Sequence, residues 1–309
     1  MNLSSFLSTT KRELTEVGLA ELTPEIRWWL SEATGESSVF FASHSCDEIE
    51  ALFTRAQLYR FSEIVNRRKR GEPLAYILGH GFFYGRSFLV GHGVLIPRPD
   101  SEKLLEVLLS VFDPDTEDSS FFGQEPCERE ICNSVTPLFF YDLCTGSGCL
   151  GITALLELRK KGIESRGCLT DISPEAIGCA RENARRLGTG DSLIFRETDL
   201  IPEEAREKSA DFILINPPYI PQGDISTLMP EVSVYEPESA LSGGPDGLLF
   251  YRRILEEGIS LLKDGGLLFA EHGYDQGESV QRLFRQHGLY PVRMYRDYGG
   301  NPRVTVGRR

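Results

Sequence analysis

The chain has 309 residues, of which 40% are hydrophobic, enough for one large domain or two ordinary domains with a buried core. Its 33 basic and 46 acidic residues give a formal net charge of −13, which disfavours a protein whose main partner is a phosphate backbone. No apolar run reaches transmembrane length, and the first residues lack the apolar core and cleavage site of a signal peptide.

Residues 1–80 have a helical pattern and differ in composition from the rest of the chain. A capping residue, a proline and an acid predict a helix start at 23–25, and a glycine ends that helix. Ser45 and Glu48 form a capping box, after which one long helix is expected over 49–70. We predict a small helical domain with no catalytic group of its own.

Residues 81–97 change character, with glycines between apolar and aromatic residues. Two short strands at 82–84 and 88–90 predict a hairpin that connects two domains. A helix then begins, with Asp100 or Ser101 as its cap.

Residues 113–135 hold seven acidic side chains and one basic side chain. With two prolines and few aliphatic residues, this stretch predicts a flexible surface insertion. The sequence assigns it no binding role.

From residue 138 onward, strand and helix patterns alternate. This alternation predicts an α/β fold with a doubly wound, mainly parallel, Rossmann-like sheet of seven strands within a domain over 98–309. The expected strands are 138–143, 167–171, 192–196, 211–215, 266–271, 289–296 and 303–307. The expected helices are 149–161, 174–187, 246–262 and 276–287.

The stretch DFILINPPY at 211–219 combines a buried strand with a stiff turn at its carboxyl end, where open α/β sheets bind ligands. Asn216 offers a side-chain carbonyl, and the Pro217 carbonyl has no expected partner. Two adjacent acceptors match the two N–H donors of a planar NH₂ group, and Tyr219 offers a flat face. A plain structural Asn-Pro turn is the alternative interpretation.

A glycine loop and a distant acid predict a nucleoside-containing cofactor. Gly146, Ser147 and Gly148 follow a strand and open a helix, and Asp171 ends the next strand at the spacing of a ribose-binding acid. The loop formally matches G-x-G-x-x-G, so a dinucleotide is the alternative. Asp142 at the strand end favours a positively charged cofactor such as S-adenosylmethionine over a diphosphate.

With these parts in place, the chain resembles class I S-adenosylmethionine-dependent methyltransferases. Within them it resembles the release-factor glutamine N5-methyltransferases (the HemK/PrmC family). The similar stretches are GEPLAYILG at 71–79, LIPRPDSE at 95–102, DLCTGSG at 142–148, TDISPEAI at 170–177, INPPYIP at 215–221, YEPESAL at 235–241 and GGPDGL at 243–248. The first two are the most specific, since enzymes that methylate amino groups of DNA and RNA share NPPY.

The resemblance implies methyl transfer from S-adenosylmethionine to the side-chain N5 of the glutamine in the Gly-Gly-Gln motif of peptide chain release factors. It implies a cofactor site that is lined by Cys144, Thr145, Gly146, Ser147, Gly148, Asp171, Leu200 and Asn216. It implies a glutamine site made of Asn216, Pro217, Pro218 and Tyr219, with Asn216, Pro217 and Tyr219 catalytic. The helical domain over 1–80 would then recognise the protein substrate.

The chain departs from the family pattern at three places. Cys144 stands where the family usually has glycine, so the backbone there must accommodate a Cβ atom. Leu200 stands where an aromatic residue is common, and the insertion at 113–135 is longer than expected.

Three competing functions follow from the residues. A DNA or RNA methyltransferase acting on adenine N6 or cytosine N4 would flip its base into the same NPPY cleft, and the acidic balance disfavours it. An NAD-dependent oxidoreductase and a non-catalytic binding module are the other two. The seven scattered cysteines predict reduced thiols in a cytoplasmic protein, and the five histidines predict no metal site. No membrane or nucleic-acid partner is expected.

Overall fold

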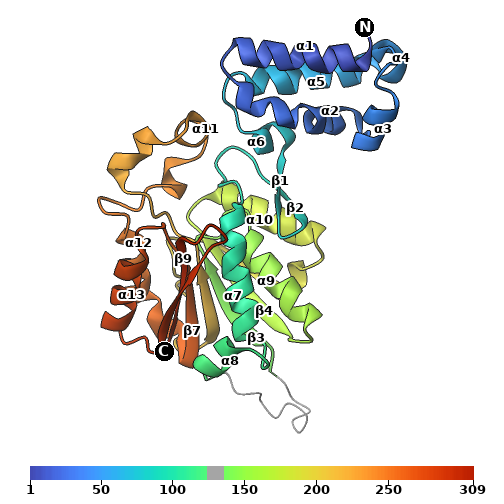
Figure 1. The fold of residues 1–309 in the computed structure, drawn as a ribbon. Helices are drawn as coiled ribbons and strands as arrows, with labels where there is room; N and C mark the ends of the chain where they lie inside the picture. Colours follow the sequence, from blue (N-terminus) through green and yellow to red (C-terminus); the bar gives the residue numbers. More distant parts are fainter. Residues whose placement is uncertain (124–135) are drawn as a thin grey trace. The chain divides into compact units, whose positions relative to one another are not determined.

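The computed structural model describes residues 1–123 and 136–309, which form two compact units (Figure 1). The first unit comprises Met1–Gly79 together with Pro230–Tyr235, and the second comprises His80–Met229 and Glu236–Arg309. The first unit thus holds six residues, 230–235, that lie far from the N-terminus in sequence.

The first unit is helical, and α1, α2 and α5 lie alongside one another in it (Figure 1). Its elements are α1 Leu3–Glu16, the 3₁₀ turn η1 Ala20–Glu25, α2 Ile26–Thr34, α3 Ser38–Ser43, α4 Ile49–Leu52, α5 Arg55–Arg68, α6 Leu74–Leu78 and α11 Pro230–Ser233. Their apolar faces meet around the wholly buried Trp29 and Phe61.

Two helix predictions in this unit are wrong. The expected helix over 49–70 is split, because Thr54 caps α5 in a capping box with Gln57. Glu48 precedes α4 and forms no side-chain cap. The expected start at 23–25 lies inside the 3₁₀ turn η1.

The second unit is built on a seven-stranded sheet, as predicted, with strand order β5-β4-β3-β6-β7-β9-β8. Only β9 runs antiparallel to its neighbours. The strands are β3 Leu138–Leu143, β4 Ser165–Asp171, β5 Leu193–Glu197, β6 Ala210–Ile215, β7 Leu262–Glu271, β8 Val292–Arg296 and β9 Pro302–Arg308. The helices are α7 Glu102–Val111, α8 Glu117–Phe121, α9 Cys149–Lys160, α10 Pro174–Arg186, α12 Leu249–Glu257 and α13 Gly277–Gln286, with short 3₁₀ turns η2 Pro99–Ser101, η3 Gly190–Ser192, η4 Gln222–Thr227, η5 Glu238–Ala240 and η6 Ile259–Leu261.

Helices cover both faces of this sheet (Figure 1), because successive side chains of a strand point to opposite faces. In β6, Phe212 and Leu214 pack in the cluster that holds α7 and α9, whereas Ile213 and Ile215 pack in the cluster that holds α12 and α13. The apolar run 212–215 within β6 follows from burial on both sides. A separate hairpin, β1 His80–Phe83 and β2 Arg86–Leu89, forms where the sequence predicts one, and it belongs to the second unit.

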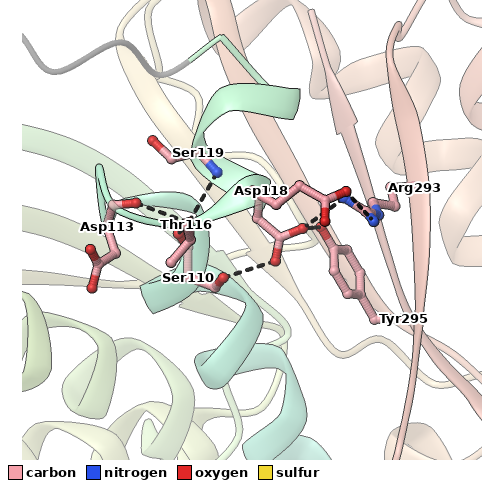
Figure 2. Close-up of polar contacts among 8 residues, drawn as sticks. Ser110, Asp113, Thr116, Asp118, Ser119, Arg293 and Tyr295 are labelled. Atoms are coloured by element: carbon pink, nitrogen blue, oxygen red, sulfur yellow. Dashed lines mark hydrogen bonds and ion pairs between the residues drawn. The ribbon is translucent and has the colours of Figure 1, made fainter.

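The first half of the predicted acidic insertion contains the helix α8, which corrects the prediction of a flexible segment there (Figure 2). Thr116 caps α8 by accepting from the backbone N–H of Ser119. Asp118 accepts from Ser110 at 2.8 Å, from Arg293 at 3.1 Å and from the Tyr295 hydroxyl at 2.7 Å. These bonds fasten α8 to α7 and β8. The remainder of the predicted insertion, 124–135, lies outside the described residues.

Candidate active site

The strand order reverses between β3 and β6, which lie side by side. From β3 the chain proceeds to β4 and β5 on one side, and from β6 to β7 on the other, so a crevice opens at the carboxyl ends of β3 and β6. A cavity of about 280 Å³ lies there, within the second unit. Its lining includes the loop after β3, the end of β4, the turn after β6 and residues 93–101 and 237–242.

Asp142 stabilises the glycine loop through hydrogen bonds with Thr145 and Gly151. It is wholly buried at the end of β3, and one of its carboxyl oxygens accepts from the Thr145 hydroxyl at 2.5 Å and from the Gly151 N–H at 2.9 Å. Burial raises its pKa to about 7, against these two hydrogen bonds. Asp142 does not line the cavity, so its carboxylate shapes the loop rather than facing the ligand space.

Asp171 ends β4 and lines the cavity, as the sequence predicts. Its two oxygens accept from the backbone N–H groups of Gly146 at 2.8 Å and Ser173 at 3.0 Å. Burial nevertheless raises its pKa. A carboxylate oxygen has more than one lone pair, so Asp171 keeps acceptor capacity for hydroxyl donors in the cavity.

Cys144 and Leu200 both line the cavity with left-handed backbones, with φ of 59° and 67°. Such a conformation is strained for a residue with a Cβ atom, and strained residues gather at ligand sites. The Leu200 carbonyl accepts from the Thr170 hydroxyl at 2.8 Å, which helps to fix this turn. Burial raises the pKa of the Cys144 thiol far above its usual range, so this thiol is neutral and unreactive.

Both arginines that line the cavity are already paired. Arg253 forms two hydrogen bonds with Asp199, at 3.0 and 3.1 Å. Arg98 pairs with the buried Glu236. Within the described part of the chain, the cavity therefore presents no free guanidinium, and a positively charged ligand meets no uncompensated cation.

The turn after β6 places two acceptors side by side. The side-chain amide nitrogen of Asn216 donates to the Ser101 hydroxyl at 3.1 Å, which leaves the side-chain oxygen of Asn216 free. Among the described residues, no hydrogen-bond donor meets this oxygen or the Pro217 carbonyl. The turn is rigid: the Tyr219 carbonyl accepts from Gln276 at 2.8 Å, and a Cβ atom at Gly247 would lie 2.3 Å from that carbonyl.

The structure brings most of the predicted site residues to one cavity. Those that line it are Cys144, Thr145, Gly146, Ser147, Asp171, Leu200, Asn216 and Pro218. Three predicted residues, Gly148, Pro217 and Tyr219, do not line it. Gly148 precedes α9 as its cap, the Pro217 ring is buried, and Tyr219 packs partly in the core beside α12.

Sequence reasoning misassigned Ser101. Neither Asp100 nor Ser101 caps a helix through its side chain, because both lie in the 3₁₀ turn η2 before α7. Ser101 instead lines the cavity and holds Asn216. Only its place in LIPRPDSE, one of the stretches similar to the methyltransferase family, marked it in the sequence.

The described residues contain no cluster of His, Cys, Asp and Glu that could hold a metal ion. Their five cysteines are free thiols, at positions 46, 144, 149, 168 and 179. Across 1–123 and 136–309, none of the helices has the length and apolarity to cross a membrane.

Comparison with known proteins finds two family models along the chain. Residues 5–79 match the PrmC N-terminal domain, and residues 138–250 match the methyltransferase small domain. The chain is 36% identical over 253 residues to the release factor glutamine methyltransferase of Thermodesulfovibrio yellowstonii, covering 82% of each chain. It is 32% identical over 300 residues to that of Caulobacter vibrioides, covering 97% of this chain and 94% of the relative.

Among solved structures, the chain is similar to the hMettl16 catalytic domain, crystallised in complex with the MAT2A 3'UTR hairpin 6. The TM-score is 0.50 and the identity 14%, over 82% of each chain. At this identity the likeness concerns the fold alone.

Proposed function

The chain belongs to the release factor glutamine methyltransferase family, and from that premise we propose its reaction in detail. It transfers a methyl group from S-adenosylmethionine to the side-chain amide nitrogen of a glutamine in a peptide chain release factor. We propose that this glutamine belongs to a Gly-Gly-Gln motif, as the family resemblance implies. The helical first unit, which matches the PrmC N-terminal domain, recognises the protein substrate.

The cavity suits S-adenosylmethionine on three counts. Asp171 offers a carboxylate to ribose hydroxyls, and the cavity lining as a whole, which includes Leu200, is largely apolar, as a nucleobase requires. The paired state of Arg98 and Arg253 leaves no free cation to repel a sulfonium. When bound, the cofactor supplies an electrophilic methyl group whose C–S bond breaks with its electron pair remaining on sulfur.

The observation that carries the proposal is the free pair of acceptors at 216–217. An amide nitrogen is a weak nucleophile, because its lone pair is delocalised into the carbonyl. Its two N–H groups donate to the Asn216 side-chain oxygen and the Pro217 carbonyl, which favours pyramidal nitrogen and stabilises the positive charge that develops there. The rigid turn aims the nitrogen lone pair at the cavity, and such positioning contributes at most about 7–11 kcal/mol. The nitrogen gives up its proton to water after the new N–C bond forms.

A nucleic-acid amino-methyltransferase is the alternative that shares the NPPY motif. The net charge of −13 opposes binding to a phosphate backbone, and the family of the chain favours a protein substrate. The likeness to the hMettl16 domain does not change this balance, because it concerns the fold.

The test incubates the purified chain with S-adenosylmethionine and either a release factor or single-stranded DNA and RNA. We expect mass spectrometry to find one methyl group on the release-factor glutamine and none on the nucleic acids. Asn216→Ala should lower turnover at least about 100-fold, as removal of a transition-state hydrogen bond does. Its control, Asn301→Ala, changes an exposed asparagine in the turn before β9 and should leave turnover unchanged. Near-normal turnover of Asn216→Ala, or methyl transfer to nucleic acid alone, would refute the proposal.

A further inference from the structure

Glu271 ends β7 beside the catalytic turn. In the parallel pairing of β6 and β7, Ile215 lies opposite Ala270, so the next residues, Asn216 and Glu271, leave the sheet side by side. The side chain of Glu271 is buried, with 1% of the residue exposed, and it does not line the cavity.

Burial of the Glu271 carboxyl group lowers the stability of the fold, because its charged form is desolvated. Among the described residues, neither of its oxygens has a hydrogen-bond partner at normal geometry, although the Ser101 hydroxyl and the Asn216 amide lie near enough to lower its pKa. Burial is the larger influence and raises that pKa to about 7. The preceding residues of β7, from Leu267 to Ala270, are all apolar, so an apolar residue at 271 would avoid the cost.

We propose that Glu271 is a positioning residue for Asn216. The Asn216 amide nitrogen has two N–H donors; one donates to the Ser101 hydroxyl at 3.1 Å, which leaves the second for the Glu271 carboxyl group that the strand register places alongside. A reversed amide would set the Asn216 oxygen against the carboxylate, which repels it. Glu271 therefore keeps the acceptor oxygen of Asn216 turned toward the substrate amide. This inference rests on the proposed role of Asn216.

The first test compares Glu271→Leu with the natural chain. Because Leu removes a buried carboxyl group whose desolvation opposes folding, the variant should unfold at the same or a higher temperature. Its kcat should fall about 10- to 100-fold, while KM for the release factor and Kd for S-adenosylmethionine change less than threefold. A purely structural role predicts the opposite pattern, with lost stability and unchanged kcat.

The second test is a double-mutant cycle. If Glu271 acts through Asn216, adding Glu271→Leu to Asn216→Ala should lower turnover no further. Glu271→Gln, whose side-chain oxygen still accepts a hydrogen bond, should restore most of the kcat that Leu loses. An unchanged kcat of Glu271→Leu, or fully multiplicative losses in the double variant, overturns this inference. Near-normal turnover of Asn216→Ala alone would instead overturn the proposed function, so the two failures are distinguishable.

Discussion

Replacing Asp142 with Asn should stabilise the protein at neutral and alkaline pH. The folded structure raises the pKa of this carboxyl group from 3.8 to about 7, so the ionised form is disfavoured in the fold. Each pKa unit corresponds to about 1.4 kcal/mol, so a difference of about 3 costs about 4 kcal/mol once the group is ionised. Below pH 3.8 the group is protonated in the folded and unfolded chain, and the fold keeps its full stability. As the pH rises through 7, Asp142 must ionise in the fold, and this stability is lost.

Asp142→Asn keeps the side-chain oxygen that accepts from Thr145 and Gly151, and it removes the charge. In urea unfolding, the unfolding free energies of the variant and the natural chain should be most alike near pH 4. By pH 8 the unfolding free energy of the variant should exceed that of the natural chain by up to about 4 kcal/mol. Other groups with raised pKa values, such as Glu271, are the same in both proteins and cancel in the comparison. A difference in unfolding free energy that does not grow between pH 4 and pH 8 would refute the assigned cause.

Two further substitutions test the loop and the insertion. Gly151→Ala should weaken S-adenosylmethionine binding at least tenfold in calorimetry, because its Cβ atom would lie 2.7 Å from the Asp142 carboxyl oxygen that holds the glycine loop; Gly178→Ala, with no atom within 4 Å, is the control. Asp118→Ala should lower the unfolding free energy by about 1–3 kcal/mol, since the Ser110, Arg293 and Tyr295 donors lose their acceptor. Its turnover should match that of the exposed control Asp115→Ala, and a lower turnover would contradict a purely structural role for α8.

The sheet and much of the cavity lining were predictable because they depend on local pattern. Apolar runs such as 212–215 mark strands, and the end of a parallel strand is where a ligand site lies, so Asn216 and Asp171 could be placed from the sequence. The expectation that the backbone at Cys144 suits a Cβ atom does not match the structure, because its left-handed φ of 59° is a conformation that glycine adopts more easily.

The parts that escaped prediction depend on which distant residues meet. Glu271 lies beside Asn216 only through the register of β6 and β7, which no local pattern specifies. Ser101 could cap a helix or accept from a side chain, and the sequence does not choose between these partners. The acidic stretch that contains Asp118 predicts a solvent-exposed segment. In the structure, Arg293 from β8 and Ser110 from α7 donate hydrogen bonds to Asp118 (Figure 2).

Residues 230–235 belong to the helical unit, so the polypeptide passes from one unit to the other three times, at 79–80, 229–230 and 235–236. No single truncation separates them. Deleting 1–79 would remove the rest of the unit to which residues 230–235 belong. Deleting 230–235 would remove the Glu231 carboxylate, which Arg68 contacts at 2.7 Å and which this residue, only 3% exposed, would then lack. An excised second unit would need a new linker in place of 230–235, because this segment joins its two parts, 80–229 and 236–309.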